Sequence, residues 1–395
     1  MQIEEIHNHR FALHHLGFRP FFLAGALFSV AAVAVWFWLY RSGAALPMRV
    51  LPPITWHAHE MIYGYALAVV AGFLLTAVSN WTGVRTLNGA PLIGLALVWL
   101  AARLMPFFGD AALAPMAILD LLFLTALSAA VLHPIVKVRQ WPQIGVWSKL
   151  ALLLVSNALF YLGLFGVLEN GVQWGIYSGL YLIISLILLM LRRVLPFFIE
   201  RGVEGQITLT NRTWVDMSSL VLMLAFWVVE VFLSLPKFSA LLAALLFLLH
   251  GLRMIDWHTP GIWRKPLLWA LYLSYGWITA GFALIALAKF GALNPWLAVH
   301  AFAYGGIGMV TLGMMARVSL GHTGRNVFEP PAVVAPMFLF LLVGALTRVA
   351  APLLAPQFYL LWMEAAQLLW VVAFASFTVV YAPFLVLPRI DGRYG

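Results

Sequence analysis

The sequence predicts an all-α, polytopic membrane protein, built as a bundle of about twelve transmembrane helices. Hydrophobic residues make up 64% of the 395 residues and charged residues only 9%, against roughly 25% charged residues in soluble domains. Apolar runs of about 20 residues, long enough to cross a bilayer as a helix, recur from end to end. The alternating ten-residue segments of a β-barrel are missing. We therefore expect residues 1–395 to form a single integral membrane domain, with residues 1–15 as a short cytoplasmic tail.

The pattern of apolar runs and breaks places each helix in turn. Pro and Gly mark most of the connections, as at Pro52-Pro53, Pro260-Gly261 and Pro330-Pro331. The twelve spans are predicted near residues 18–40, 56–79, 91–108, 114–133, 147–167, 173–198, 213–234, 238–253, 266–290, 295–318, 332–350 and 357–387.

Basic residues in the short loops predict the orientation, because Lys and Arg resist translocation. With the N-terminus inside, 17 Lys and Arg residues fall on the cytoplasmic side and five on the other. Both termini are therefore expected on the cytoplasmic side of the membrane. This distribution accounts for the net charge of +9 without a nucleic-acid partner, so the lipid bilayer is the expected surrounding.

Six charged residues are expected within the outer halves of their spans, where a charge costs roughly 2.5–3.5 kcal/mol at mid-bilayer and needs a partner or a purpose. They are Glu60, Arg103, Asp120, Glu230, Arg348 and Glu364. Carboxylates reach the membrane surface less easily than Lys or Arg. The set therefore favours a buried site toward the periplasmic side.

Three histidines accompany these charges. In the stretch WHAHEM, His57 and His59 precede Glu60, and His59 begins a His-x-x-x-Tyr-Gly pattern that recurs from His300 to Tyr304 and Gly305. His57, His59 and His300 are all candidate metal ligands. Because His57 and His59 point about 200° apart in a regular helix, they bind one centre together only if residues 56–58 are irregular. Otherwise they serve two centres, or one binds the metal while the other supports it. His59 and His300 are the better pair for the two axial positions of haem b. Copper is the alternative and takes two or three imidazoles in closer convergence. Cysteine is absent, which excludes thiolate ligands.

The remaining candidates take supporting roles. Glu60 is expected to orient a ligand or donate protons, and Asp120, Glu364 and Tyr304 complete the candidate catalytic set. Arg103 and Arg348 fit haem propionates as bidentate partners, or they pair with the buried carboxylates. His322 is a further candidate metal ligand. It lies 22 residues after His300, about 33 Å along a continuous helix, so the two cannot share a metal.

Four stretches resemble one family. LGFRPFFLAG at 16–25, WHAHEMIYGYALAVVAGFLLTAVSNWTG at 56–83, HAFAYGGIGMVTLGMMARVSLGHTGR at 300–325 and VYAPFLVLPRIDGRYG at 380–395 are similar to the NnrS family of bacterial membrane proteins. The resemblance covers the chain but departs at LRRVLPFFIERG and at Tyr161, where His is common in the family. It implies twelve spans, haem b and copper, and a role with nitric oxide in denitrification or nitrosative stress.

The resemblance favours a haem- and copper-containing protein that binds or turns over nitric oxide. Turnover would make it an oxidoreductase and would need an electron donor, a quinol or a periplasmic cytochrome. Two alternatives stay open at this point. One is a twelve-span secondary transporter or a metal or haem permease, and the other is a non-catalytic sensor or buffer of nitric oxide.

Overall fold

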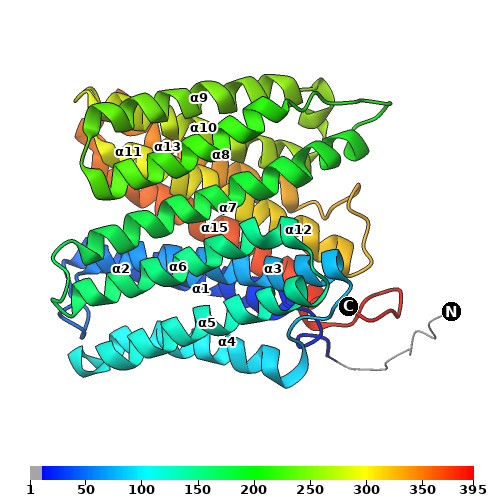
Figure 1. Ribbon diagram of the computed structural model, residues 1–395, viewed down its shortest axis with the longest axis horizontal. Coiled ribbons are helices and arrows are strands. Elements are labelled where there is room, and N and C mark those ends of the chain that lie inside the picture. Colours follow the sequence, from blue (N-terminus) through cyan, green and yellow to red (C-terminus); the bar gives the residue numbers. More distant parts are fainter. Residues whose placement is uncertain (1–10) are drawn as a thin grey trace. The chain divides into compact units, whose positions relative to one another are not determined.

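A computed structural model describes residues 11–395, and these residues contain helices and no strand. The tail predicted over residues 1–15 therefore lies mostly outside the described residues. Figure 1 shows the helices in chain order. Their bounds are α1 Phe18–Ser42, α2 Pro53–His59, α3 Leu67–Thr82, α4 Gly89–Leu104, α5 Leu113–Lys137, α6 Ile144–Leu164, α7 Gly171–Gly202, α8 Thr213–Val228, α9 Pro236–Trp257, α10 Pro266–Lys289, α11 Pro295–His300, α12 Met309–His322, α13 Val334–Val349, α14 Ala351–Leu354 and α15 Tyr359–Val386.

Twelve of these helical stretches within residues 11–395 are long and apolar enough to cross a membrane, which confirms the predicted number. Prolines stand at the first position of many of them, for example at Pro53, Pro236 and Pro266. A helix tolerates proline there because the first N–H groups have no partner within the helix. One revision concerns α9, which continues to Trp257 rather than ending near residue 253.

Three short π-helical segments interrupt the spans. They are η1 Glu60–Ala66 between α2 and α3, η5 Val229–Leu233 after α8, and η7 Ala301–Gly308 between α11 and α12. Two of the three begin directly after the histidine of the His-x-x-x-Tyr-Gly pattern. Isolated π turns inside helices occur often at functional sites, so the repeated sequence pattern corresponds to a repeated backbone feature.

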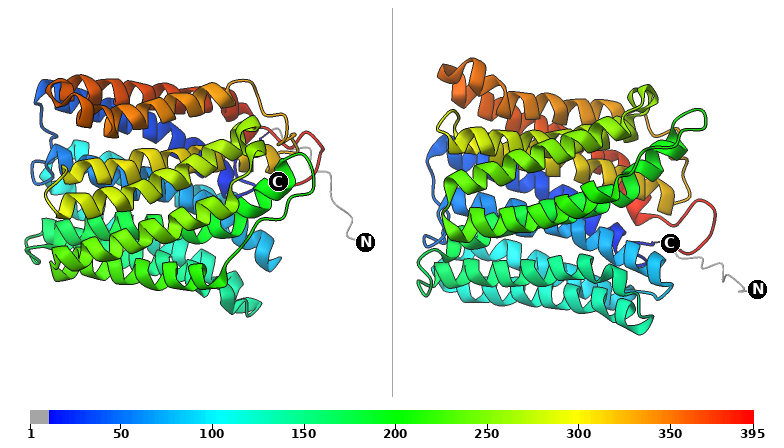
Figure 2. Two further views of the ribbon diagram at one scale, coloured as in Figure 1. Left: turned by 90° about the horizontal axis from the view of Figure 1, so that it is seen from above. Right: turned by 45° about the horizontal axis from the view of Figure 1, so that its top comes forward.

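The described chain separates into two compact units. Unit 1 holds the chain up to Gly179 together with Met315–Val327 and Phe374–Gly395, and unit 2 holds Leu180–Met314 and Phe328–Ala373. In unit 1, α4 packs on α5 and α5 packs on α6, as the cyan and green-cyan ribbons of Figure 2 show. In unit 2, α9 lies between α8 and α10, and α10 also contacts η7. The single domain predicted over residues 1–395 stays a prediction.

In unit 1, Arg19 connects the start of α1 to the end of α15. The side chain is fully buried, and its Nη1 donates to the carbonyls of Phe384, Leu385 and Leu387 at 3.1, 2.8 and 2.8 Å. These carbonyls end α15, where the helix leaves its last C=O groups without partners and favours a cation. Gly17 beside it allows a close approach, since a Cβ there would lie 2.4 Å from that of Leu75.

Replacing Arg19 by Met should destabilise unit 1, because three carbonyls, that of Leu385 buried and the other two partly buried, lose a charged donor. Hydrogen bonds to charged groups contribute about 1.5–3 kcal/mol each, and we expect a loss of about 3 kcal/mol. Denaturant unfolding of the purified protein in detergent measures it. Arg49→Met, at an exposed position, is the control and should change stability by less than about 0.5 kcal/mol.

Candidate functional site

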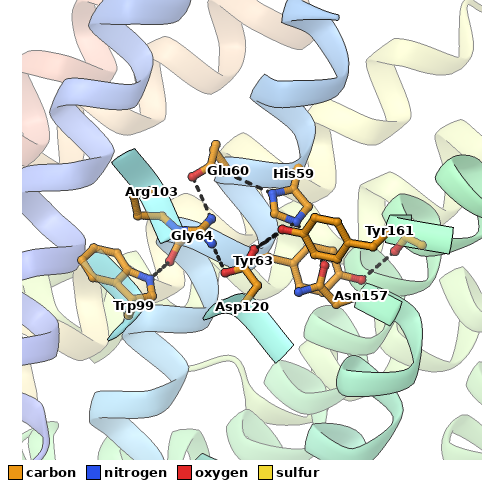
Figure 3. A network of polar contacts seen from close by, with 10 residues as sticks. His59, Glu60, Tyr63, Gly64, Trp99, Arg103, Asp120, Asn157 and Tyr161 are labelled. Atoms are coloured by element: carbon orange, nitrogen blue, oxygen red, sulfur yellow. Dashed lines mark hydrogen bonds and ion pairs between the residues drawn. The ribbon is translucent and has the colours of Figure 1, made fainter. Parts of the chain in front are cut away.

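A buried polar network in unit 1 contains the WHAHEM stretch (Figure 3). Its side chains come from four spans: His59 from α2 and Glu60 from η1 in one span, Arg103 from α4, Asp120 from α5, and Asn157 and Tyr161 from α6. All six side chains are at most 2% exposed. The network therefore joins the second, third, fourth and fifth spans through side chains that are buried from solvent.

Arg103 lies at the centre of this network. Its Nη1 is 2.8 Å from Glu60 Oε2, and its Nη2 pairs with Asp120 Oδ1. Tyr161 donates its hydroxyl proton to the other Asp120 oxygen. Of the two roles that the sequence suggested for Arg103, pairing with carboxylates is the one seen in the structure.

His59 uses both ring nitrogens in the same network. Nδ1 lies 3.1 Å from Glu60 Oε1, and Nε2 lies 3.1 Å from Asn157 Oδ1 and 3.6 Å from Asp120 Oδ2. Both ring nitrogens of His59 are therefore engaged with side chains of the network. The Arg103 charge is paired with both carboxylates, and such pairing is what makes buried charges tolerable.

Gly64, in the π segment η1, lets the side chains of the network approach the backbone closely. The carbonyl of Gly64, in the π segment, accepts a hydrogen bond from Trp99 Nε1 at 3.0 Å. A Cβ on Gly64 would lie 2.6 Å from Phe28 and 2.9 Å from Glu60 Oε2. Tyr63 donates to the Gly175 carbonyl at 2.7 Å. Glycine in the His-x-x-x-Tyr-Gly pattern is thus required by the close approach of the ion pair.

His57 faces a different environment from His59. Its ring stacks on Trp36, with centroids 4.6 Å apart and an angle of 9° between the planes. The two rings therefore lie in different surroundings, and whether both bind one centre stays a prediction. His322 also lies in unit 1, where its carbonyl accepts a hydrogen bond from Arg389 and its ring lies 5.5 Å from that of Phe18.

Unit 2 contains the second histidine of the pattern. The Nδ1 of His300 lies 2.8 Å from the Trp296 carbonyl, and Nε2 lies 3.2 Å from Arg348 Nη2. Because a carbonyl only accepts, the ring proton is on Nδ1 and the lone pair is on Nε2. This is the tautomer and the orienting contact typical of a metal-binding histidine. The guanidinium of Arg348 also lies 5.5 Å from the centre of the Tyr359 ring.

Three other residues that the sequence singled out lie in unit 2, namely Tyr304, Glu364 and Glu230. Tyr304, like Tyr63 in unit 1, donates to a backbone carbonyl, that of Ala366, at 2.7 Å. Glu364 is half-buried on α15. Glu230 instead pairs with Lys289 at 2.8 Å. Within residues 11–395, no three His, Asp or Glu side chains are arranged to hold a metal ion.

No role was predicted from the sequence for Asn157 or Tyr161. Neutral polar residues change the hydropathy of an apolar run very little, and Tyr161 stood out only as a departure from the family pattern.

A second group that was not predicted lies in unit 2, where Asp216, His250, Arg253 and Tyr275 contact one another. The predicted end of the eighth span near residue 253 placed His250 and Arg253 at a helix end, whereas both are buried within α9.

Comparison with known families matches residues 12–389 to the family model described as NnrS protein. The match covers nearly the whole chain and confirms the resemblance predicted from the four sequence stretches. No curated protein matches the chain.

The ion network predicts non-additive mutations. Asp120→Asn should destabilise the protein by about 3 kcal/mol or more, because it leaves part of the buried Arg103 charge uncompensated. Adding Arg103→Gln to Asp120→Asn should cost less than Arg103→Gln costs in the wild type, because the contact between Arg103 and Asp120 is already lost. Unfolding of the wild type, both single variants and the double variant gives the coupling energy. Purely additive effects would contradict the network.

Proposed function

Because this chain belongs to the NnrS family, we propose that it is an inner-membrane protein of the nitric oxide response that binds nitric oxide at a haem b held by His300. Family membership supports the coarser part of this proposal, a membrane protein of the nitric oxide response. The finer part rests on one observation, the fixed orientation of the His300 ring with its Nε2 lone pair directed at Arg348.

The residues present fit haem held by His300 alone better than haem held by His59 and His300. Nε2 of His300 accepts from Arg348, and haem binding would replace this contact. Arg348 has the fork geometry that would then bind a carboxylate such as a propionate. Both nitrogens of His59 contact side chains of the unit 1 network, so in this proposal His59 belongs to that network. The bound haem would supply an iron that binds a diatomic gas.

Copper fits the described residues less well. A copper centre takes two or three converging imidazoles, and His57, His59, His300 and His322 do not form such a set within either unit. We therefore assign no step to copper.

Turnover of nitric oxide would consume protons and electrons. Glu60 and Asp120 are held in ion pairs with Arg103, in unit 1. In this proposal Glu364 and Tyr304, both in unit 2 with His300, supply the protons. The electrons come from a quinol or a periplasmic cytochrome. The apolar gas itself dissolves in the bilayer and needs no aqueous channel.

The ligand assignment is tested by the absorption spectrum and metal content of the purified protein, before and after addition of nitric oxide. We expect a Soret band that shifts with nitric oxide in the wild type and is lost in His300→Gln. The band should persist in His59→Gln and in the control His133→Gln, an exposed histidine on α5. A full Soret band in His300→Gln would overturn the assignment. Metal-dependent flux into liposomes without a chromophore would favour the permease instead.

The proposed orientation, with both termini cytoplasmic and His300 toward the periplasm, rests on the distribution of Lys and Arg. Reporter enzymes fused to the C-terminus test it. We expect activity from a reporter that works in the cytoplasm and none from one that needs the periplasm. A fusion at the loop between α10 and α11, near Gly291, should give the opposite result.

A further inference from the structure

A second buried network, in unit 2, lies outside the proposed haem site. It contains Arg192 from α7, Asp216 from α8, Arg253 and His250 from α9, and Tyr275 from α10. Exposure of the side chains falls along the chain of contacts, from 36% at Arg192 and 20% at Asp216 to 6% at Arg253. His250 and Tyr275 are buried. The network therefore leads from the surface, at the end of the unit where α8 begins, into its interior.

The contacts are short and continuous. Asp216 accepts from Arg192 and from Arg253 Nη2, at 2.7 Å in each case. Arg253 Nη1 donates to the Tyr275 oxygen at 2.9 Å. The Tyr275 oxygen in turn lies 2.5 Å from His250 Nδ1. Arg253 Nη2 also reaches Ser219 Oγ at 3.1 Å.

These contacts fix the tautomer of His250. Arginine only donates hydrogen bonds, so the Tyr275 oxygen accepts from Arg253 and directs its own proton at His250 Nδ1. Arg253 Nη1, 3.3 Å from Nδ1, also requires Nδ1 to accept. The ring proton is therefore on Nε2, assigned from the hydrogen-bond network.

The Nε2–H group of His250 points into the apolar interior. Among residues 11–395, no atom accepts a hydrogen bond from it. One face of the ring stacks on Phe282, with centroids 5.7 Å apart. A buried donor without an acceptor is costly, and such groups in native proteins are usually satisfied by an ordered water or a ligand.

We propose that Tyr275 and His250 form a proton relay that connects the surface near Asp216 to an oxygen acceptor, water or a ligand oxygen, at His250 Nε2. The Nε2–H bond breaks as its proton passes to the acceptor. At the same time the Tyr275 O–H bond breaks and an Nδ1–H bond forms. Arg253 stabilises the resulting phenolate, which takes a proton from a water molecule that enters beside Asp216 and leaves as hydroxide. The net result is the transfer of one proton from that water to the acceptor, with His250 left in the Nδ1–H tautomer and no change in oxidation state.

This relay does not depend on the proposed haem site, and its test needs no enzymatic activity. Without a relay, the buried Nε2–H exchanges with solvent only when unit 2 opens locally, at the rate of the surrounding backbone amides of α9. With the relay, it exchanges without such opening. Full-length protein in lipid nanodiscs, labelled with ¹⁵N-histidine, reports both the tautomer and the exchange rate by NMR. Loss of one signal in His250→Gln assigns the resonance.

We expect a neutral Nε2–H signal in the wild type that exchanges faster than the α9 amides. Tyr275→Phe should slow this exchange by about 100-fold, the lower range for a positioned proton-transfer group. Tyr272→Phe is the matched control, because Tyr272 lies one turn away on α10 and donates to the Met254 carbonyl. It should leave the rate unchanged.

Asp216→Asn, at the partly exposed entrance, provides a second variant that leaves both relay groups in place, and it should also slow the exchange. The relay is excluded by an imidazolium or Nδ1–H signal in the wild type. It is equally excluded by exchange no faster than that of the α9 amides, or by equal rates in Tyr275→Phe and wild type.

Discussion

Pairing of charges inside the bilayer is the constraint on which unit 1 depends. Arg103 cannot leave the apolar layer without breaking its contacts to Glu60 and Asp120, and neither carboxylate can lose Arg103 without becoming an isolated buried charge. Since the three residues come from three different spans, satisfying their charges also fixes how those spans pack. The polar network is therefore a structural requirement as well as a candidate functional feature.

Much of this organisation could be predicted from the sequence. Hydropathy alone indicated the twelve spans, and helix periodicity correctly separated the directions of His57 and His59. The partners could not be predicted, because His59 contacts Asn157 across 98 positions of sequence and a neutral amide adds little to a hydropathy profile. The end of α9 was missed for a related reason. Arg253 is paired with Asp216 inside α9, whereas hydropathy placed it at the boundary of the span because its partner could not be predicted.

The His-x-x-x-Tyr-Gly pattern occurs once in each unit, in different chemical surroundings. Each has a histidine before a π segment and a tyrosine that donates to a backbone carbonyl of a neighbouring helix. In unit 1 the histidine contacts a carboxylate and a side-chain amide within an ion network. In unit 2 it contacts a backbone carbonyl and an arginine, and Nε2 accepts from the arginine. The same sequence pattern thus places its histidine in two different chemical surroundings, and the difference comes from neighbours distant in the sequence.

The π segments have a consequence for how such sites can change. A π turn contains an additional residue compared with the α turn that it replaces. Removing one residue from η1 or η7 would restore regular α-helix and change how the histidine lies relative to the tyrosine of the same pattern. The relative placement of these two rings therefore depends on the length of the segment between them. A single-codon deletion there, with both side chains retained, would alter it.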